Sequence, residues 1–250
     1  MATTNDARES AAGPLTGHAR WLELCMDTVE DGPRLGAFWA AVIGGEHKTS
    51  GADPAGNVVV PGVEGGGIAM CPVPEAKAVK HRVHLDVYAA AIGDLEALGA
   101  TVLRPAEESG LGWTVMADPE GGEFCAFLRD PDVLPAYRLH GVGVDSADPE
   151  RIARWWGDRF GLTPHDNDGG GWWTLDGVTN DPVLTFDFAP VPEPKTVKNR
   201  VHWDVYGDVA DFEAAGAKVL WTMPRWTTMA DPEGNEFCVF PPNGGGGASI

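Results

Sequence analysis

The sequence contains no apolar run that approaches the ~20 residues of a membrane-spanning helix, which argues against a membrane protein. Basic residues are also scarce, because 18 Lys and Arg stand against 37 Asp and Glu, for a net charge of −19. This balance argues against nucleic acid as a partner, since binding to phosphates depends on clustered Lys and Arg. It is compatible with a cationic ligand, although high charge also serves solubility.

The four cysteines include no Cys-x-x-Cys pair, which excludes a zinc ribbon or a thioredoxin motif. No Ser-His-Asp nucleophile signature is present either. The first 17 residues lack the apolar core of a signal peptide, so we expect a cytoplasmic protein. In that compartment all four cysteines are expected to be reduced thiols.

The sequence does contain a long internal repeat. The segment 75–88 recurs at 193–206, and the segment 113–127 recurs at 226–240. Two tandem copies of one domain are therefore expected. The boundaries that we infer are a disordered leader at 1–17, copy one at 18–128, a proline-marked linker at 129–136, copy two at 137–242 and a flexible tail at 243–250.

Within each copy the pattern alternates between strand and helix signals. In copy two, residues 139–144 resemble a strand, and Asp148 followed by Pro149 is typical of a helix start. Apolar residues then recur at helical spacing up to Phe160, and Gly161 ends the helix. The same plan repeats in each half copy. We therefore expect an α+β fold with four β-α-β-β-β-like modules, two in each copy.

Strand alternation places chemically active side chains together. In the segment 82–88, Val83, Leu85 and Val87 share one face of the strand. His84, Asp86 and Tyr88 share the other face, as His202, Asp204 and Tyr206 do in copy two.

The closing strand of each copy carries a Glu and a Cys on one face: Glu123 and Cys125 in copy one, Glu236 and Cys238 in copy two. If curvature brings the polar faces together, each His meets these groups. His, Glu and Cys are good ligands for divalent zinc or iron. The alternative is that each His bonds to its neighbouring acid and binds no metal.

The motifs at 148–151, 192–202 and 230–238 resemble the vicinal oxygen chelate superfamily, which includes glyoxalase I, extradiol dioxygenases and bleomycin-resistance proteins. The likeness is in particular to actinobacterial tandem glyoxalase-like proteins, and it covers roughly residues 18–242. It implies that each copy is a pair of βαβββ modules that form a curved, mostly antiparallel sheet around a cleft. With four modules in one chain, either a monomer or a homodimer is expected.

In metal-using members of that superfamily, the ligands come from the first strand, from a His on the fifth strand and from a Glu on the last strand. His84 and His202 match the fifth-strand position, and Cys125 and Cys238 match the last. The first-strand position falls on Glu23 in copy one and on Gly141 in copy two. His140 is adjacent and is expected on the opposite face unless the register slips. The resemblance thus implies a site for Zn, Fe, Mn or Ni in copy one, made by Glu23, His84 and either Cys125 or Glu123.

The favoured function is binding of a small organic molecule, aromatic or cationic, as in the drug-binding relatives. Its expected lining consists of Asp86, Tyr88, Trp113, Trp173, Asp204, Tyr206 and Trp226. One alternative is a metal-dependent lyase, isomerase or dioxygenase with Glu123 or Glu236 as the base. Another is a metal-free enzyme that uses His84 with Asp86, or His202 with Asp204, as an acid–base pair.

Two basic triplets remain: Lys77, Lys80 and Arg82 in copy one, and Lys195, Lys198 and Arg200 in copy two. They either clamp an anionic substrate or pair with surface acids, and pairing is the favoured interpretation.

Overall fold

The computed structural model describes residues 17–29, 33–51, 53–167 and 169–242. The expected leader up to residue 16 and the expected tail lie outside these ranges. No helix within them is long and apolar enough to span a membrane.

Four modules follow one another along the chain, and each begins with a long strand. Module 1 consists of β1 (Arg20–Thr28), α1 (Arg34–Ile43), β2 (Glu46–Lys48), β3 (Asn57–Val59) and β4 (Ile68–Pro72). Module 2 consists of β5 (Val83–Ala89), α2 (Ile92–Leu98), β6 (Thr101–Arg104), α3 (Ala106–Ser109), β7 (Thr114–Ala117) and β8 (Glu123–Leu128).

A short 3-10 helix, η1 (Pro131–Val133), lies in the linker between the copies. Module 3 consists of β9 (Leu139–Ser146), α4 (Pro149–Phe160), β10 (His165–Asp166), β11 (Trp173–Asp176) and β12 (Thr185–Pro190). Module 4 consists of β13 (Val201–Tyr206), α5 (Val209–Ala214), β14 (Lys218–Thr222), β15 (Thr227–Ala230) and β16 (Glu236–Phe240). The expected α+β class with four modules is confirmed.

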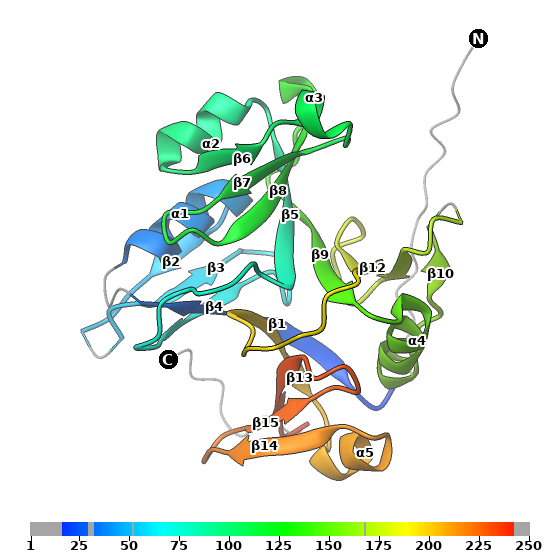
Figure 1. The fold of residues 1–250 in the computed structure, drawn as a ribbon. Coiled ribbons are helices and arrows are strands. Elements are labelled where there is room, and N and C mark those ends of the chain that lie inside the picture. The colour runs from blue at the N-terminus through cyan, green and yellow to red at the C-terminus, as the bar shows by residue number, and fades with distance from the viewer. Residues whose placement is uncertain (1–16, 30–32, 52, 168, 243–250) are drawn as a thin grey trace.

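The modules pair across the two copies. Sheet A has the order β14-β15-β16-β13-β1-β4-β3-β2 and combines module 4 with module 1. Sheet B has the order β10-β11-β12-β9-β5-β8-β7-β6 and combines module 3 with module 2. The central contacts, β1 with β13 and β5 with β9, are antiparallel, whereas first and last strands within a module are parallel. Figure 1 shows sheet B above sheet A.

Helix α4 begins and ends at the residues that the sequence indicates. The Asp148 carboxylate accepts a hydrogen bond from the Arg151 N–H at 3.3 Å, which satisfies a free donor of the first turn. Gly161 ends the helix at φ 71°, a left-handed conformation that glycine adopts without penalty. Trp156 and Phe160 on its inner face are fully buried.

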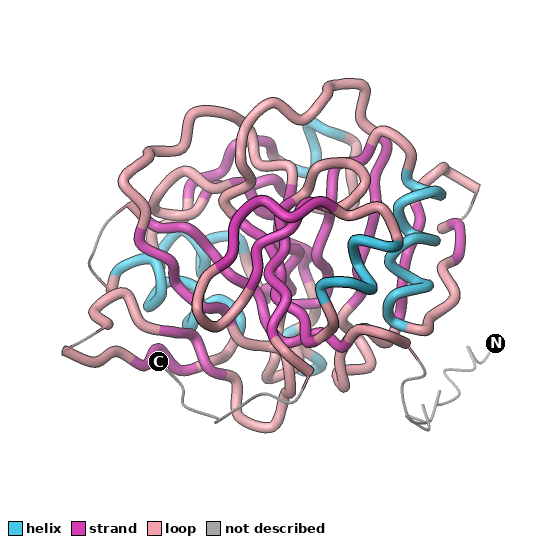
Figure 2. Tube along the Cα trace, turned by 90° about the horizontal axis from the view of Figure 1, so that it is seen from below, coloured by secondary structure: helices cyan, strands magenta, loops and turns pink. Residues whose placement is uncertain are grey.

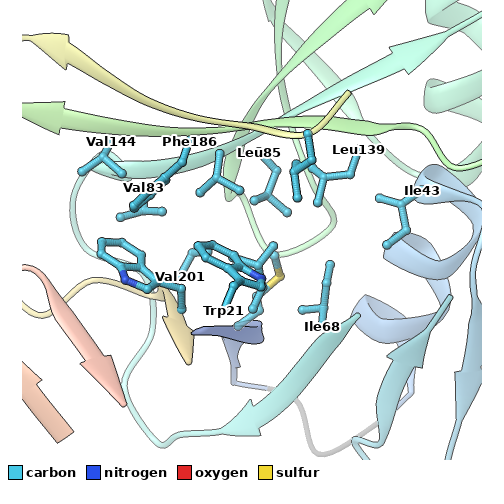
Figure 3. Packing of buried hydrophobic residues seen from close by; sticks show 14 of the residues in the cluster. Trp21, Ile43, Ile68, Val83, Leu85, Leu139, Val144, Phe186 and Val201 are labelled. Atoms are coloured by element: carbon cyan, nitrogen blue, oxygen red, sulfur yellow. The ribbon is translucent and has the colours of Figure 1, made fainter. Parts of the chain in front are cut away.

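One continuous core lies between the two sheets. Val83 and Leu85 of sheet B face Val201 and Trp21 of sheet A (Figure 3). Burying each large apolar side chain contributes roughly 1.5–3 kcal/mol, so this layer holds the two sheets together. Helix α1 contacts both β3 and β5 at one flank of the layer, and the strands run through the middle of the molecule (Figure 2).

Candidate functional site

The face of each sheet that points away from the core is polar, as strand alternation predicts. On β5, Val83, Leu85 and Val87 are buried in the core. His84 and Asp86 lie on the opposite face, where Cys125 of β8 is the register partner of Asp86. Ligand atoms of His84, Asp86 and Cys125 all lie within 4.8 Å of one another. The structure thus brings His84 and Cys125 together, with Asp86 as the third member.

Sheet A carries the equivalent cluster of His202, Asp204 and Cys238, also within 4.8 Å. His202 Nε2 is 3.5 Å from the Cys238 sulfur and 3.7 Å from Asp204 Oδ1. Nδ1 of His202 and Oδ1 of Asp204 are buried without a hydrogen-bond partner among the described residues.

Glu123 and Glu236, the expected bases, accept hydrogen bonds that fix the loops in front of β5 and β13. Glu123 accepts hydrogen bonds from Lys77 Nζ at 2.8 Å and from the His81 N–H at 2.9 Å. Glu236 is held in the same way by Lys195 Nζ at 2.7 Å and by the Asn199 N–H at 3.0 Å. Burial raises the pKa of Glu123, but the Lys77 ammonium and the bond from His81 outweigh it and hold that pKa below its ordinary value. A carboxylate held in this way is a weak base.

The structure does not bring Glu23 together with His84 and Cys125. Strand β1 pairs with β13 of the second copy, so Glu23 is the register partner of Asp204 and lies on sheet A. Its charge and burial both raise the pKa of Asp204, with burial the larger cause. The first-strand position of module 1 thus joins the His202 and Cys238 cluster, and the first-strand position next to His84 is Gly141.

Two glycines distinguish sheet B from sheet A. Gly141 and Gly143 are the register partners of Asp86 and His84, whereas Glu23 and Cys25 are the partners of Asp204 and His202. A Cβ built on Gly143 would be 2.5 Å from His84 Nε2, so the imidazole lies against bare backbone. The floor of sheet B is therefore free of side chains at two places that sheet A fills.

A disulfide closes the same region of sheet A. It joins Cys25 of β1 to Cys71 of β4, with Cα atoms 6.6 Å apart. The expectation that all four cysteines are reduced thiols is therefore wrong for these two. The side chains of His202 and Asp204 are each 8% exposed, against 20% for His84 and 15% for Asp86. The polar face of sheet A is therefore packed shut, whereas solvent reaches that of sheet B.

Asp187 of β12 adds a second carboxylate to sheet B. A Cβ built on Gly141 would be 3.2 Å from Asp86 Oδ2 and 3.3 Å from Asp187 Oδ2, so both acids converge above this glycine. Asp187 also accepts a hydrogen bond from the Thr174 hydroxyl at 2.6 Å. Burial raises the pKa of both carboxyls, and for Asp86 the charge of Asp187 adds to the effect. Oδ1 of Asp86 is buried without a hydrogen bond from any described residue.

A register shift places His140 on this polar face. The pairing of β5 with β9 passes from Asp86–Gly141 to Val87–Leu139, so His140 is bulged out of the ladder. Its ring stacks on Tyr88 at a centroid distance of 4.0 Å and meets the edge of Phe127 at 4.6 Å. The expectation that His140 points to the opposite face is therefore wrong. The cause is a register slip, the one exception that the sequence analysis allows.

Two tryptophans meet across the polar face of sheet B. Trp113 precedes β7 and Trp172 precedes β11, and four strands separate β7 from β11 in the sheet. Their rings are nevertheless 6.0 Å apart, because the sheet curves until its two halves approach. Trp113 also stacks on Phe127 at 5.2 Å. The result is an aromatic wall above the acidic floor.

The other expected lining residues lie elsewhere. Trp173 is on the opposite face of β11 from Thr174, beneath the Arg154 guanidinium at 4.9 Å. In sheet A, Trp226 stacks on Phe240 at 5.8 Å, and Arg20 lies 4.7 Å above the ring of Tyr206. The expected lining does not include Trp172, one of the tryptophans that the sequence places on strands, or Asp187. Alternation within 183–188 could have found Asp187, because Phe186 and Phe188 there mark the core face.

The buried histidines are neutral. Burial lowers the pKa of His84 to about 4 and that of His202 to about 3. A neutral imidazole offers a lone pair to a metal, whereas burial raises the pKa of Cys125 and Cys238 and keeps these thiols protonated. The donor set is of the type that binds zinc or iron, and the unpartnered atoms of Asp86, Asp204 and His202 are compatible with a ligand role.

Two curved sheets, each built from a pair of βαβββ modules with a His, an Asp and a Cys on its polar face, define a paired-module protein of the vicinal oxygen chelate type. The sequence matches the glyoxalase-like domain family over residues 23–127 and 141–240, and the chain belongs to that family. No curated protein sequence matches it.

Solved structures agree on the fold. Glyoxalase I from Zea mays is 14% identical with a TM-score of 0.63, and the match covers 90% of this chain and 92% of that one. A putative dioxygenase from Bacillus subtilis is 14% identical with a TM-score of 0.57, over 90% of this chain and 87% of that one. At such identities the likeness shows the fold alone.

Proposed function

We propose that this protein binds a small aromatic molecule carrying a positive charge, at the polar face of sheet B. We call this the sheet-B site. Its floor is His84, Asp86, Cys125 and Asp187, and its wall is Tyr88, Phe127, His140, Trp113 and Trp172. The observation that carries the proposal is the pair Gly141 and Gly143, because these residues bring no side chain to the floor where Glu23 and Cys25 stand in sheet A, so that His84, Asp86 and Asp187 lie against bare backbone.

The charge of the ligand follows from the two acids. Asp86 and Asp187 converge above Gly141, and burial raises the pKa of both, with the charge of Asp187 as a further cause for Asp86. No ion pair joins either carboxylate to a described Lys or Arg. By contrast, Glu123 pairs with Lys77, and Asp145 pairs with Lys80. An ammonium group placed between them would remove their repulsion and fill the vacant bond of Asp86 Oδ1.

The aromatic character follows from the wall. Trp113 and Trp172 present ring surface on one side, and His140, which stacks on Tyr88, presents it on another. The other face of Tyr88 is covered by the Arg129 guanidinium at 4.3 Å. Such surfaces favour a flat ring through stacking and a cation through the ring quadrupole. The side chains named here bind and orient the ligand, and the proposal assigns them no bond-making step.

Isothermal titration with naphthylmethylamine and with its neutral isostere naphthylmethanol tests the proposal. The amine should bind about tenfold more tightly, since one charge-assisted hydrogen bond contributes roughly 1.5–3 kcal/mol. Asp187→Asn should remove most of this difference while leaving the fold intact. Equal affinity for the two compounds, or no binding of either, would sink the proposal.

A matched control comes from the closed sheet. Asp204→Asn alters the equivalent of Asp86 in sheet A, and it should leave naphthylmethylamine binding unchanged. If Asp204→Asn weakens the amine as much as Asp187→Asn does, the ligand does not select sheet B.

A second function, divalent metal binding, is favoured by the cluster in sheet A. His202, Asp204 and Cys238 would hold the ion, with Glu23 on the adjacent strand as a fourth donor. Glu23, His202 and Cys238 stand at the first-strand, fifth-strand and last-strand ligand positions that the family resemblance implies, and Asp204 is an additional donor. A bound ion would supply Lewis acidity, and the chain's own part would be to hold it in a water-excluding setting.

Metal analysis of protein purified without a His-tag tests this second proposal. Roughly one equivalent of zinc or iron should be retained, and His202→Ala should lose it. The control is His165→Ala, an exposed histidine that pairs with Asp176. Protein that stays metal-free after exposure to zinc, manganese and nickel would contradict it.

A further inference from the structure

The two basic triplets of the repeat differ in one member. Five of the six cations have a carboxylate partner: Lys77 with Glu123, Lys80 with Asp145, Lys195 with Glu236, Lys198 with Asp27 and Arg200 with Glu120. Arg82 is the sixth, and it forms no ion pair with a described carboxylate. The expected pairing with acids therefore holds everywhere except at this residue.

Arg82 is nevertheless held in a fixed position. Its guanidinium donates to the backbone carbonyl of Glu193 at 2.8 Å and to that of Asp145 at 3.1 Å. Its Nε is buried without a hydrogen-bond partner among the described residues. A guanidinium that is oriented by neutral carbonyls keeps its full charge, so it is ready for an anion.

A cavity of about 310 Å³ opens beside this guanidinium. Arg151 of α4, Lys195 and Ala147 line it together with Arg82, Asp145 and Glu233. Its two acids already have partners: Lys80 bonds to Asp145 at 2.8 Å, and the Asp148 N–H bonds to Glu233 at 2.9 Å. Lys195 is paired as well, with Glu236, and Arg151 is paired with Asp148 and Glu233. Arg82 is therefore the lining cation without a carboxylate partner among the described residues, in a chain whose net charge is −19.

The internal repeat allows Arg82 to be compared with its equivalent in copy two. Arg200 occupies the equivalent place in copy two, and there the Glu120 carboxylate lies 3.6 Å from the guanidinium. The equivalent of Glu120 is Glu233, which caps the start of α4 and has Arg151 at 3.6 Å instead of Arg82. Glu233 lines the same cavity as Arg82 but pairs with Arg151, so the ion pair that Arg200 has is lacking at Arg82 among the described residues.

We infer that this cavity is a binding site for a small carboxylate anion, which gives Arg82 the ion pair that Glu120 gives Arg200. Arg82 anchors the carboxylate, and Arg151 and Lys195 flank it. The site lies outside the sheet-B site and does not depend on the function proposed for it. Inorganic phosphate also fits a guanidinium fork. The carboxylate is favoured because the group that the equivalent Arg200 meets is the carboxylate of Glu120.

Fluorine NMR of trifluoroacetate with the full-length protein tests the inference. The wild type should broaden the trifluoroacetate signal, and succinate should reverse the broadening at lower concentration than phosphate does. Arg82→Gln should weaken binding by about tenfold, because it removes the charge of the anchor. Ala147→Phe fills the cavity without removing a charge and should have a similar effect, which decides the matter if Arg82→Gln fails to fold.

Two arginine variants are the controls. Arg200→Gln removes the equivalent guanidinium that already has its carboxylate, and Arg154→Gln removes a charge elsewhere on α4. Both should bind trifluoroacetate as the wild type does. The inference is overturned if the wild type gives no broadening, if the controls lose binding as much as Arg82→Gln, or if phosphate displaces the probe better than succinate. That last result would indicate a general oxyanion site.

Discussion

The imidazole of His84 lies directly against the backbone of Gly143, and a Cβ at that position would stand 2.5 Å from Nε2. In sheet A the corresponding neighbours are His202 and Cys25, and Cys25 is tied to Cys71. Gly143 in place of a disulfide-bonded cysteine is thus one of the two differences, with Gly141 in place of Glu23, that distinguish the polar face of sheet B from that of sheet A.

Gly143→Ala should damage the sheet-B site in a graded way. The new methyl group must displace the His84 ring, which overpacks the floor and costs about 1–3 kcal/mol of unfolding free energy. Affinity for naphthylmethylamine should fall about tenfold by titration calorimetry. Gly93→Ala in α2 is the control, since nothing lies within 4 Å of its added Cβ. If Gly143→Ala binds and unfolds as Gly93→Ala does, the ring does not need this glycine.

Trp172 should contribute to binding and little to stability. It is 41% exposed and meets Trp113 across the polar face, so Trp172→Ala removes one side of the wall without opening the core. We expect a loss of roughly 1–2 kcal/mol in binding and less than about 0.5 kcal/mol in unfolding free energy. Trp221→Ala, at 44% exposure on β14, is the matched control and should leave binding unchanged. Equal losses in both variants would place the ligand elsewhere.

The two copies should stay together after the linker between them is cut. β1 pairs with β13 and β5 with β9, so each sheet needs strands from both copies. A protease site placed within 129–136, where Val133 is 70% exposed, should yield two fragments that co-elute on size exclusion without denaturant. Two fragments that separate as folded monomers would contradict the cross-copy pairing.

Thiol mapping should find two classes of cysteine. Alkylation in denaturant without a reductant should label Cys125 and Cys238, and leave Cys25 and Cys71 joined in one disulfide-linked peptide. Prior treatment with a dithiol should make all four available. Four labelled cysteines before reduction would restore the expectation from the sequence.

The stability of the protein should fall in acid, in part because of His140. Burial, with the charge of Arg129, lowers the pKa of this imidazole from 6.5 to about 4. The unfolded chain therefore takes up a proton first, so the contribution of His140 is present above pH 6.5 and is lost as the pH falls toward 4. Its share is at most about 3 kcal/mol. His140→Phe should flatten the slope of unfolding free energy across this window, and an unchanged slope would refute it.

Much of the fold could be predicted because the relevant signals are local. Alternation along 82–88 placed His84 and Asp86 on one face, and Asp148 with Gly161 marked the ends of a helix. The pairing of β1 with β13 rather than with β5 has no local signal in the sequence. β5 and β13 carry nearly the same residues, so either could pair with β1. Glu23 was therefore placed with His84, whereas it lies beside Asp204.

The composition of the site escaped prediction for a similar reason. His140 reaches the polar face only because one residue is bulged out of a ladder, and no pattern of residue types signals such a slip. The sequence favours Trp173 over its neighbour Trp172, because only the register of β11 fixes which of the two side chains lies on the polar face. The effect of Gly141 and Gly143 appears only when they are compared with their partners in the other sheet.

The central claim is that the sheet-B site is the working site and that the polar face of sheet A is closed. A crystal structure of the protein with naphthylmethylamine tests it most directly. The claim predicts the ammonium between Asp86 and Asp187 and the rings against Trp172, with no ligand at His202. Ligand bound at His202 and Asp204, with the sheet-B site empty, would contradict it.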